Sequence, residues 1–189
     1  MRRLIGGVAL LVLAATAAAC GHTVGAGPAL DVSWAPDSGQ LSDLYTARLS
    51  PHSHPSGFIS FRVVHDGAVK TLARCSFHAL ANPGSVRIRA AAHSILVAWT
   101  IPGGSGARSA RLMVPKGLQS GGGSSWSGGT FEPRKPNWTW TVWEEEYAPS
   151  WPGDEYSGMT IGDFSGLVYD SVHNPHRTAY CVVIKVDPQ

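Results

Sequence analysis

The sequence predicts an all-β domain, an antiparallel β-sandwich with glycine- and proline-rich loops. Short runs of β-branched and aromatic residues are separated by clusters of Gly, Pro, Asn and Ser, which is typical of strands joined by turns. Long helical periodicities are absent from the sequence. The chain also has 22 Gly and 13 Pro among its 189 residues, so residues that interrupt helices are frequent.

The domain is expected to begin with a strand. Residues 29–34 (ALDVSW) alternate between apolar and polar positions and end at a proline-containing turn. Residues 41–49 (LSDLYTARL) leave two alternatives open, because their leucines and Tyr45 fit either a helical stripe or the start of a strand. Residues 51–57 (PHSHPSG) predict a loop.

The clearest local structure is a hairpin formed by residues 58–65 and 68–77. Asp66 and Gly67 lie between these apolar runs and have the composition of a type I′ turn, in which both residues need positive φ. Apolar residues occupy both faces of the first strand. This pattern indicates a central hairpin rather than an edge hairpin.

Three further strands are predicted after the hairpin. Residues 86–91 alternate, with Arg87 and Arg89 on one face and apolar side chains on the other. Residues 94–101 (SILVAWTI) are the most continuously apolar segment and predict a core strand. Residues 110–114 (ARLMV) predict a shorter strand.

A low-complexity stretch separates these strands from the C-terminal part. Residues 116–136 contain SGGGSSWSGG, which offers too little apolar surface to offset the entropy of ordering, and predict a mobile loop. Residues 137–143 (NWTWTVW) then alternate and predict a strand with Trp138, Trp140 and Val142 on one face.

The C-terminal segments complete the predicted sandwich. Residues 159–169 predict one or two short strands, residues 173–177 (HNPHR) a turn, and residues 179–186 (AYCVVIKV) a final strand. Cys75 ends the hairpin and Cys181 lies in the final strand, so we expect a disulfide between them that joins opposing sheets.

The first twenty residues predict export. Arg2 and Arg3 form a basic region, residues 4–15 an apolar run, and residues 17–19 a small-residue cleavage site. The apolar run is shorter than the roughly 20 residues that span a bilayer, so a cleaved signal is expected rather than a membrane-spanning helix.

The end of this leader, Ala17-Ala18-Ala19-Cys20, resembles the lipobox of bacterial lipoproteins. The resemblance implies that Cys20 becomes the acylated first residue of the mature chain; conventional cleavage just before Cys20 is the alternative. The chain has three cysteines, and lipidation of Cys20 beside a Cys75–Cys181 disulfide leaves no stray thiol in an oxidising compartment.

These observations divide the chain into three parts. Residues 1–19 are expected to be a cleaved signal peptide, residues 20–28 the lipidated cysteine and a flexible tether, and residues 29–189 a single domain. The protein is therefore expected on the extracytoplasmic face of the cell membrane, held by its lipid anchor.

Charge excludes two classes of partner. Without Arg2 and Arg3, the 15 Lys and Arg of the chain fall to 13, equal to its 13 Asp and Glu. A neutral mature chain argues against nucleic-acid binding and against polybasic membrane binding. Residues 21–120 carry nine Lys and Arg against four Asp and Glu, and residues 121–189 carry four against nine. Either the two halves neutralise each other, or the C-terminal half presents an acidic ligand face.

Aromatic and acidic residues crowd into the segment between residues 126 and 156. Tryptophan rings stack on sugars and carboxylates accept hydrogen bonds from sugar hydroxyls, whereas Trp138 and Trp140 are better explained as core residues. The predicted ligand-binding residues are Trp126, Trp143, Glu145, Tyr147, Trp151 and Asp154.

Two histidine pairs are candidate metal ligands. His52 and His54 lie in one proline-containing loop, and His173 and His176 in another. They could bind zinc or copper if the fold brought the two loops together, and otherwise are exposed loop residues. No sequence motif implies a cofactor.

The sequence thus predicts a lipid-anchored, non-catalytic β-sandwich that binds an envelope protein or a glycan. The alternative is an extracytoplasmic, glycosidase-like hydrolase that uses a pair of acids between Glu144 and Glu155. The chain contains neither a G-x-S-x-G nucleophile elbow nor a phosphate-binding loop, so neither chemistry is indicated.

Overall fold

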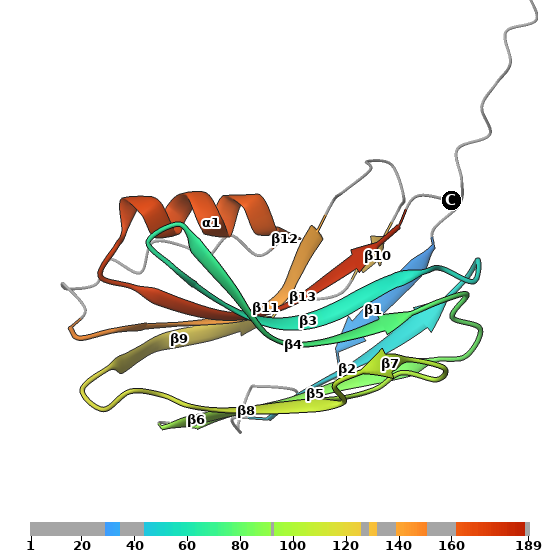
Figure 1. Ribbon diagram of the computed structural model, residues 1–189, viewed down its shortest axis with the longest axis horizontal. Coiled ribbons are helices and arrows are strands. Elements are labelled where there is room, and N and C mark those ends of the chain that lie inside the picture. The colour runs from blue at the N-terminus through green and yellow to red at the C-terminus, as the bar shows by residue number, and fades with distance from the viewer. Residues whose placement is uncertain are drawn as a thin grey trace, which may run out of the picture.

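The computed structural model describes residues 29–34, 44–91, 93–125, 129–131, 139–150 and 162–187. Its strands form two antiparallel sheets, and helix α1 (Phe164–His173) lies on the outer face of one of them (Figure 1). The predicted all-β sandwich is therefore confirmed, with the addition of the helix.

The strands of sheet A pair in an order that differs from their order in the sequence. Across the sheet lie β10 (Gly129–Phe131), β1 (Leu30–Trp34), β2 (Leu44–Pro51), β5 (Gly84–Ala91), β6 (Ser94–Thr100) and β8 (Ser109–Met113). Residues 41–49, which the sequence left open between helix and strand, therefore contribute to a strand that begins at Leu44.

Sheet B supplies the second layer. Across it lie β12 (Gly162–Asp163), β11 (Thr139–Ala148), β13 (Thr178–Val186), β3 (Gly57–His65), β4 (Ala68–Phe77) and β7 (Ser105–Gly106). A further strand, β9 (Gln119–Ser125), pairs with the second half of β11. The long predicted strands of the hairpin and the C-terminus thus lie at the centre of this sheet.

The main core fills the space between the two sheets. Ile88 and Val97 from sheet A and Phe61, Trp143 and Ile184 from sheet B are all fully buried in it. Burying one such side chain contributes roughly 1.5–3 kcal/mol. A smaller core lies between sheet B and α1 and contains Val64, Leu167, Ala179, Cys181 and Val183.

The predicted hairpin is confirmed. β3 and β4 pair from His65 and Ala68 onward, and Asp66 and Gly67 have φ values of 48° and 71°. Both values are positive, as a type I′ turn requires. β3 lies between β13 and β4, so the hairpin is central in its sheet, as its two apolar faces indicated.

The alternation in β5 is also confirmed, because Val86, Ile88 and Ala90 are buried whereas Arg87 and Arg89 are exposed. The core strand predicted for residues 94–101 is confirmed, because Ile95, Val97 and Trp99 of β6 are buried in the main core. Only the inner face of β6 is covered, so Leu96 remains 41% exposed. An apolar run therefore did not distinguish a strand that is buried on one face from one that is buried on both.

The mobile loop predicted for residues 116–136 is wrong for its described part. β9 and β10 form there, and β9 pairs with β11 through a backbone ladder from Gln119 to Ser125. Backbone hydrogen bonds need no side chains, so a Gly- and Ser-rich segment can complete a sheet without any hydrophobic signal.

Of the short strands predicted for residues 159–169, residues 159–161 lie outside the described residues, and the described part forms one two-residue strand and the start of a helix. Gly162 and Asp163 make β12, and the chain then enters α1. Phe164, Leu167, Val168 and Ser171 face sheet B at a helical spacing. This stripe is what binds the helix to the sheet.

The predicted Cys75–Cys181 disulfide is wrong, because both cysteines are buried free thiols. Cys75 on β4 faces the main core, whereas Cys181 on β13 faces α1, on the opposite side of sheet B. β3 lies between the two strands, which places them about 10 Å apart. A disulfide requires Cα atoms within about 7 Å, so the sheet keeps these thiols apart.

Candidate functional site

The predicted aromatic site is part of the core. Trp143 and Tyr147 are fully buried between the sheets, and Glu145 is 7% exposed. The Tyr147 hydroxyl and the Ser120 hydroxyl donate hydrogen bonds to Glu145 Oε1, at 2.9 and 2.7 Å. The sequence prediction is therefore wrong for these residues, because they are closed to a soluble ligand.

A β-bulge explains part of this error. The register of β11 against β13 shifts between Thr141 and Trp143, so Val142 and Trp143 both belong to the main core. Strict alternation from the sequence cannot reveal such a shift. The other predicted ligand-binding residues, Trp126, Trp151 and Asp154, lie outside the described residues, as does Trp138.

The two histidine pairs are not brought together. His52 follows β2 and leads toward the start of β3, where its Nε2 lies 2.6 Å from Asp31 Oδ2; His54 is also exposed. His173 ends α1 and His176 follows in an exposed turn near the other end of β3. Among the residues that the structure describes, no three His, Cys, Asp or Glu side chains could share a metal ion.

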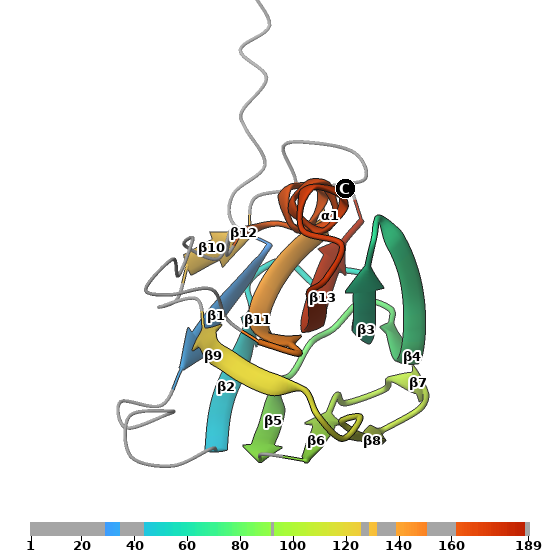
Figure 2. The ribbon, with the colours of Figure 1, turned by 90° about the vertical axis from the view of Figure 1, so that its left-hand side faces the viewer.

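The outer face of sheet A has no other described element packed on it (Figure 2). In Figure 2, α1 lies over β11 and β13, whereas β5, β6 and β8 lie on the opposite side of the molecule with no described element beyond them. Four exposed arginines, Arg48, Arg87, Arg89 and Arg111, point outward from this sheet. We call this surface the arginine face.

The strand register orders the arginine face into rows. Each row holds residues that lie opposite one another on neighbouring strands, and successive rows are two residues apart, about 6.7 Å. The three rows are Arg48–Ser85–Thr100, Thr46–Arg87–Ala98–Ser109 and Leu44–Arg89–Leu96–Arg111. Arginines thus occur in every row and are separated by small, hydroxyl-bearing or aliphatic side chains.

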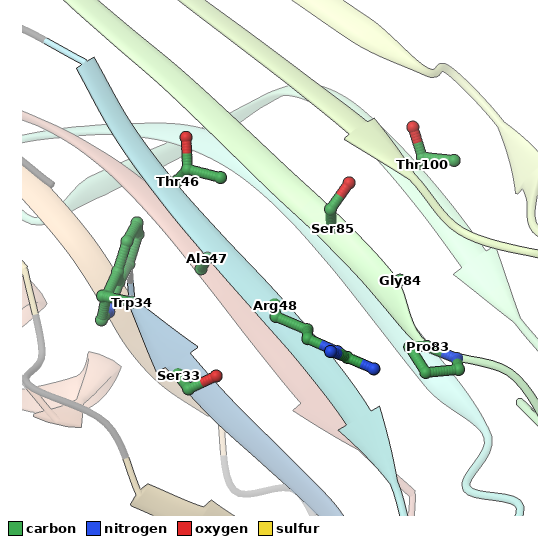
Figure 3. Close-up of a pocket in the computed structure, with 9 residues that line it drawn as sticks. All are labelled: Ser33, Trp34, Thr46, Ala47, Arg48, Pro83, Gly84, Ser85 and Thr100. Atoms are coloured by element: carbon green, nitrogen blue, oxygen red, sulfur yellow. The ribbon is translucent and has the colours of Figure 1, made fainter. Parts of the chain in front are cut away.

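Two adjoining grooves lie on this face. The first has a volume of about 380 Å³ and is lined by Ser33, Trp34, Thr46, Ala47, Arg48, Pro83, Gly84, Ser85 and Thr100 (Figure 3). The second has a volume of about 520 Å³ and is lined by Leu44, Thr46, Arg87, Arg89, Leu96 and Ala98. Thr46 lines both grooves, so they lie side by side across β2, β5 and β6, and we call the two grooves together the trough.

Unneutralised positive charge distinguishes this trough. None of the four guanidinium groups has an ion-pair partner among the described residues. Asp31 is the acid that this face carries among those residues, and its carboxylate is already paired with His52. Arg87 and Arg89 lie two residues apart on one strand, where their repulsion in water is about 0.6 kcal/mol. A bound anion would relieve this repulsion.

The wall of the first groove is fixed by aromatic contacts. Trp34 packs edge-on against Tyr45 with ring centroids 6.4 Å apart, and Tyr45 packs against Trp143 at 6.0 Å. Trp143 is fully buried in the core. The groove wall is therefore held by the interior of the sandwich, which reduces the entropy that a ligand must overcome.

A second group of charged residues lies beneath α1. Glu144 is fully buried, and neither of its carboxylate oxygens has a hydrogen-bond partner among the described residues. Burial, together with the charges of Glu146 and Asp170, raises the pKa of Glu144 to about 8. This side chain is therefore protonated and neutral at neutral pH.

The ionisable groups around Glu144 are also buried or half-buried, and opposite charges offset the cost of their burial only in part. Burial raises the pKa of Glu146, and Arg177, 3.6 Å away, acts in the opposite direction. Burial likewise raises the pKa of the Cys181 thiol, and the nearby Glu144 adds to this effect. Arg62 donates a hydrogen bond to the Ser60 hydroxyl at 2.9 Å. Neither groove of the arginine face is lined by these residues. We therefore treat them as part of the packing between sheet B and α1 and not as part of the candidate site.

The acids of β11 do not form a glycosidase pair. Glu144 faces α1, whereas Glu145 faces the main core, because successive residues of a strand point to opposite sides of the sheet. A glycosidase needs two carboxylates across one open cleft. The remaining predicted acids, Asp154 and Glu155, lie outside the described residues.

Sequence analysis missed the arginine face as a site, although two of its signals were present. Arg87 and Arg89 alternate with apolar residues, and residues 21–120 carry an excess of basic residues. What the sequence lacks is the strand order, which places Arg48 and Arg111 beside them.

Comparison with known proteins adds no assignment, because no family model, no curated protein and no solved structure matches this chain. Within the described part of the chain, no helix combines the length and the apolar character that crossing a bilayer would need.

Proposed function

We propose that this chain is a lipid-anchored protein of the cell envelope whose β-sandwich binds an anionic ligand on the arginine face. One observation carries the proposal: Arg48, Arg87 and Arg89 line a trough on the outer face of sheet A, and neither they nor the neighbouring Arg111 have an ion-pair partner among the described residues. Guanidinium groups bind carboxylate, phosphate and sulfate through paired hydrogen bonds, which favours an acidic ligand. The proposed binding surface is therefore on sheet A and not, as the sequence predicted, in the Trp-rich segment.

The lipid anchor is supported by the leader alone. Because Cys75 and Cys181 are free thiols, the odd number of cysteines no longer argues for modification of Cys20, whereas the lipobox-like Ala17–Cys20 still does. In a bacterial host, Cys20→Ala should abolish incorporation of a labelled fatty acid and release the protein from the membrane fraction. A variant that stays in that fraction would contradict the anchor.

A binding role is favoured over a catalytic one by the acids of β11. The two buried glutamates, Glu144 and Glu145, face opposite sides of sheet B and lie away from the trough. The trough itself is lined by Trp34 and by arginine, hydroxyl-bearing and aliphatic residues, with no acid or histidine among these described residues. Such a lining can hold an anion but offers neither a general base nor an activated nucleophile.

The proposal is tested by retention on a dextran sulfate column compared with a dextran column. Wild-type protein should bind only the sulfated matrix, and raised salt should release it because exposed charges are screened. Arg87→Gln with Arg89→Gln should weaken binding at least about tenfold, since about 1.4 kcal/mol of charge-assisted hydrogen bonding is lost.

The matched control is Lys70→Gln with Lys116→Gln. Both lysines are exposed and lie off the arginine face, and this pair changes the net charge by the same amount. The control should keep wild-type retention. Equal losses in the two double variants would show a general charge effect and would contradict a site on sheet A.

A further inference from the structure

The proposed anionic ligand can be narrowed by the chemistry of the two grooves. We infer that it is an acidic oligosaccharide that lies along the trough, with its sugar hydroxyls in the first groove and its acidic groups on Arg87 and Arg89. This inference rests on the proposed function, because it requires the arginine face to be the binding surface.

The first groove has the composition of a sugar subsite. Its lining includes four hydroxyl-bearing side chains, those of Ser33, Thr46, Ser85 and Thr100. Hydroxyl groups both donate and accept hydrogen bonds, as sugar hydroxyls do, so the two sets are complementary. Trp34 borders this groove (Figure 3), and its ring packs on Tyr45 on the core side of sheet A, so the sugar would be held there by hydroxyl groups.

The second groove has the composition of an acid subsite. Arg87 and Arg89 supply two guanidinium groups, and Leu44 and Leu96 flank Arg89 within one row of the sheet. Leu44 is 37% exposed, so this row presents apolar surface as well as charge. An acidic sugar unit combines an anionic group with apolar C–H surface, which matches this pairing.

The length of the trough favours an oligosaccharide over a single acidic sugar. Three rows about 6.7 Å apart span about 13 Å from Arg48 to Arg89 along the strands. The two grooves share Thr46 and therefore lie side by side. A ligand with several linked rings can therefore reach both the hydroxyl-lined and the arginine-lined parts.

Two other occupants fit the observations less well. A second copy of the chain, related by two-fold symmetry, would place arginines against arginines, because such an interface uses the same surface twice. An anionic bilayer would contact the rim of the trough, but a flat surface would leave the hydroxyls inside the first groove unused. The charge and the hydroxyl-bearing lining together favour the oligosaccharide.

The experiment compares probes that separate charge from sugar chemistry, using calorimetry on the full mature chain. The acidic probes are an oligogalacturonate and a sulfated oligosaccharide of equal length. The first control is the methyl-esterified oligogalacturonate, which is neutral and keeps the same ring hydroxyls. The second is a polyglutamate of equal charge, which has no hydroxyls. The third is a preparation of vesicles rich in phosphatidylglycerol. At least one acidic oligosaccharide should bind about tenfold tighter than every control.

Side-chain variants locate the two subsites. Thr100→Val keeps the shape of the first groove and removes one hydroxyl, so it should weaken the acidic oligosaccharide several-fold and leave polyglutamate unchanged. Arg89→Gln should weaken both anionic probes. Thr71→Val is the matched control, because Thr71 is exposed on β4 of the other sheet; it should change neither.

The outcomes separate this inference from the proposed function. Polyglutamate or vesicles that bind as tightly as the oligosaccharides, without an effect of Thr100→Val, would overturn the oligosaccharide and leave an anion-binding face. Binding of the neutral ester with equal affinity would overturn both proposals, as would failure of every anionic probe to bind.

Discussion

Replacing Glu144 with glutamine should stabilise the protein above pH 8 and leave its stability at pH 4 nearly unchanged. Glu144 is fully buried without a hydrogen-bond partner among the described residues, and its pKa is raised from 4.5 to about 8. The folded state therefore holds this proton more tightly than the unfolded chain. The contribution of Glu144 to the free energy of unfolding is greatest below pH 4.5. It falls as the pH rises toward 8 and stays constant above that value.

The size of the pKa shift sets an upper limit on the difference in unfolding free energy between the variant and the wild-type protein. A shift from 4.5 to about 8 corresponds to about 5 kcal/mol, at about 1.4 kcal/mol for each pH unit. Glutamine has nearly the same shape and cannot ionise, so the variant should lack this part of the pH dependence. The other groups that interact with Glu144, namely Glu146, Asp170 and Cys181, stay in place and affect both proteins.

Urea unfolding followed by tryptophan fluorescence between pH 4 and pH 9 measures this difference. The free energies of unfolding should agree within about 1 kcal/mol at pH 4 and diverge toward pH 8, with the variant more stable. Asp187→Asn is the control, because Asp187 is exposed and should show no such divergence. Curves that stay parallel over the whole range would refute a neutral, buried Glu144.

Two further predictions concern the hairpin turn and the cysteines. Gly67→Ala should destabilise the fold by about 1–2 kcal/mol in urea unfolding, because Gly67 has φ of 71° and an added Cβ would meet Val172 at 2.8 Å. Gly103→Ala, with φ of 68° and no atom within 4 Å, should cost less, and equal costs would contradict the Val172 contact. Unreduced, unfolded protein should react with a thiol reagent at both Cys75 and Cys181, whereas the folded protein should react slowly, since burial raises the pKa of both thiols. Failure of both cysteines to react after unfolding would show a disulfide.

Local sequence signals were sufficient for most of the strands. Asp66-Gly67 fixes a type I′ turn by the φ values it allows, and the alternation of residues 86–91 fixes which side of β5 is buried. Both signals depend on neighbouring residues only, so they can be read without the fold. They suffice for the fold class and for most strand positions.

Features that depend on distant segments could not be predicted. β9 is held by the backbone of β11, so its Gly- and Ser-rich sequence carries no apolar pattern. The side of sheet B that each cysteine faces follows from strand order and register, which two strand assignments do not specify. The burial of Trp143 depends on a bulge one residue away.

The candidate site shows the same division. The sequence places Arg87 and Arg89 on one side of a strand, but their neighbours across the sheet come from strands that precede and follow them. Arg48 comes from β2 and Arg111 from β8, so the positive surface exists only after the sheet has assembled. The composition shows the excess of basic residues between residues 21 and 120 but does not show that four of these arginines share one face of a sheet.

The separation of the two thiols has a consequence for biogenesis. With Cys75 and Cys181 on opposite sides of sheet B, no covalent link holds the described fold together. Folding of the described part then requires no thiol oxidase, and its stability should not change with the redox potential of its surroundings. The domain should therefore fold in the reducing cytoplasm of an expression host as readily as outside the membrane.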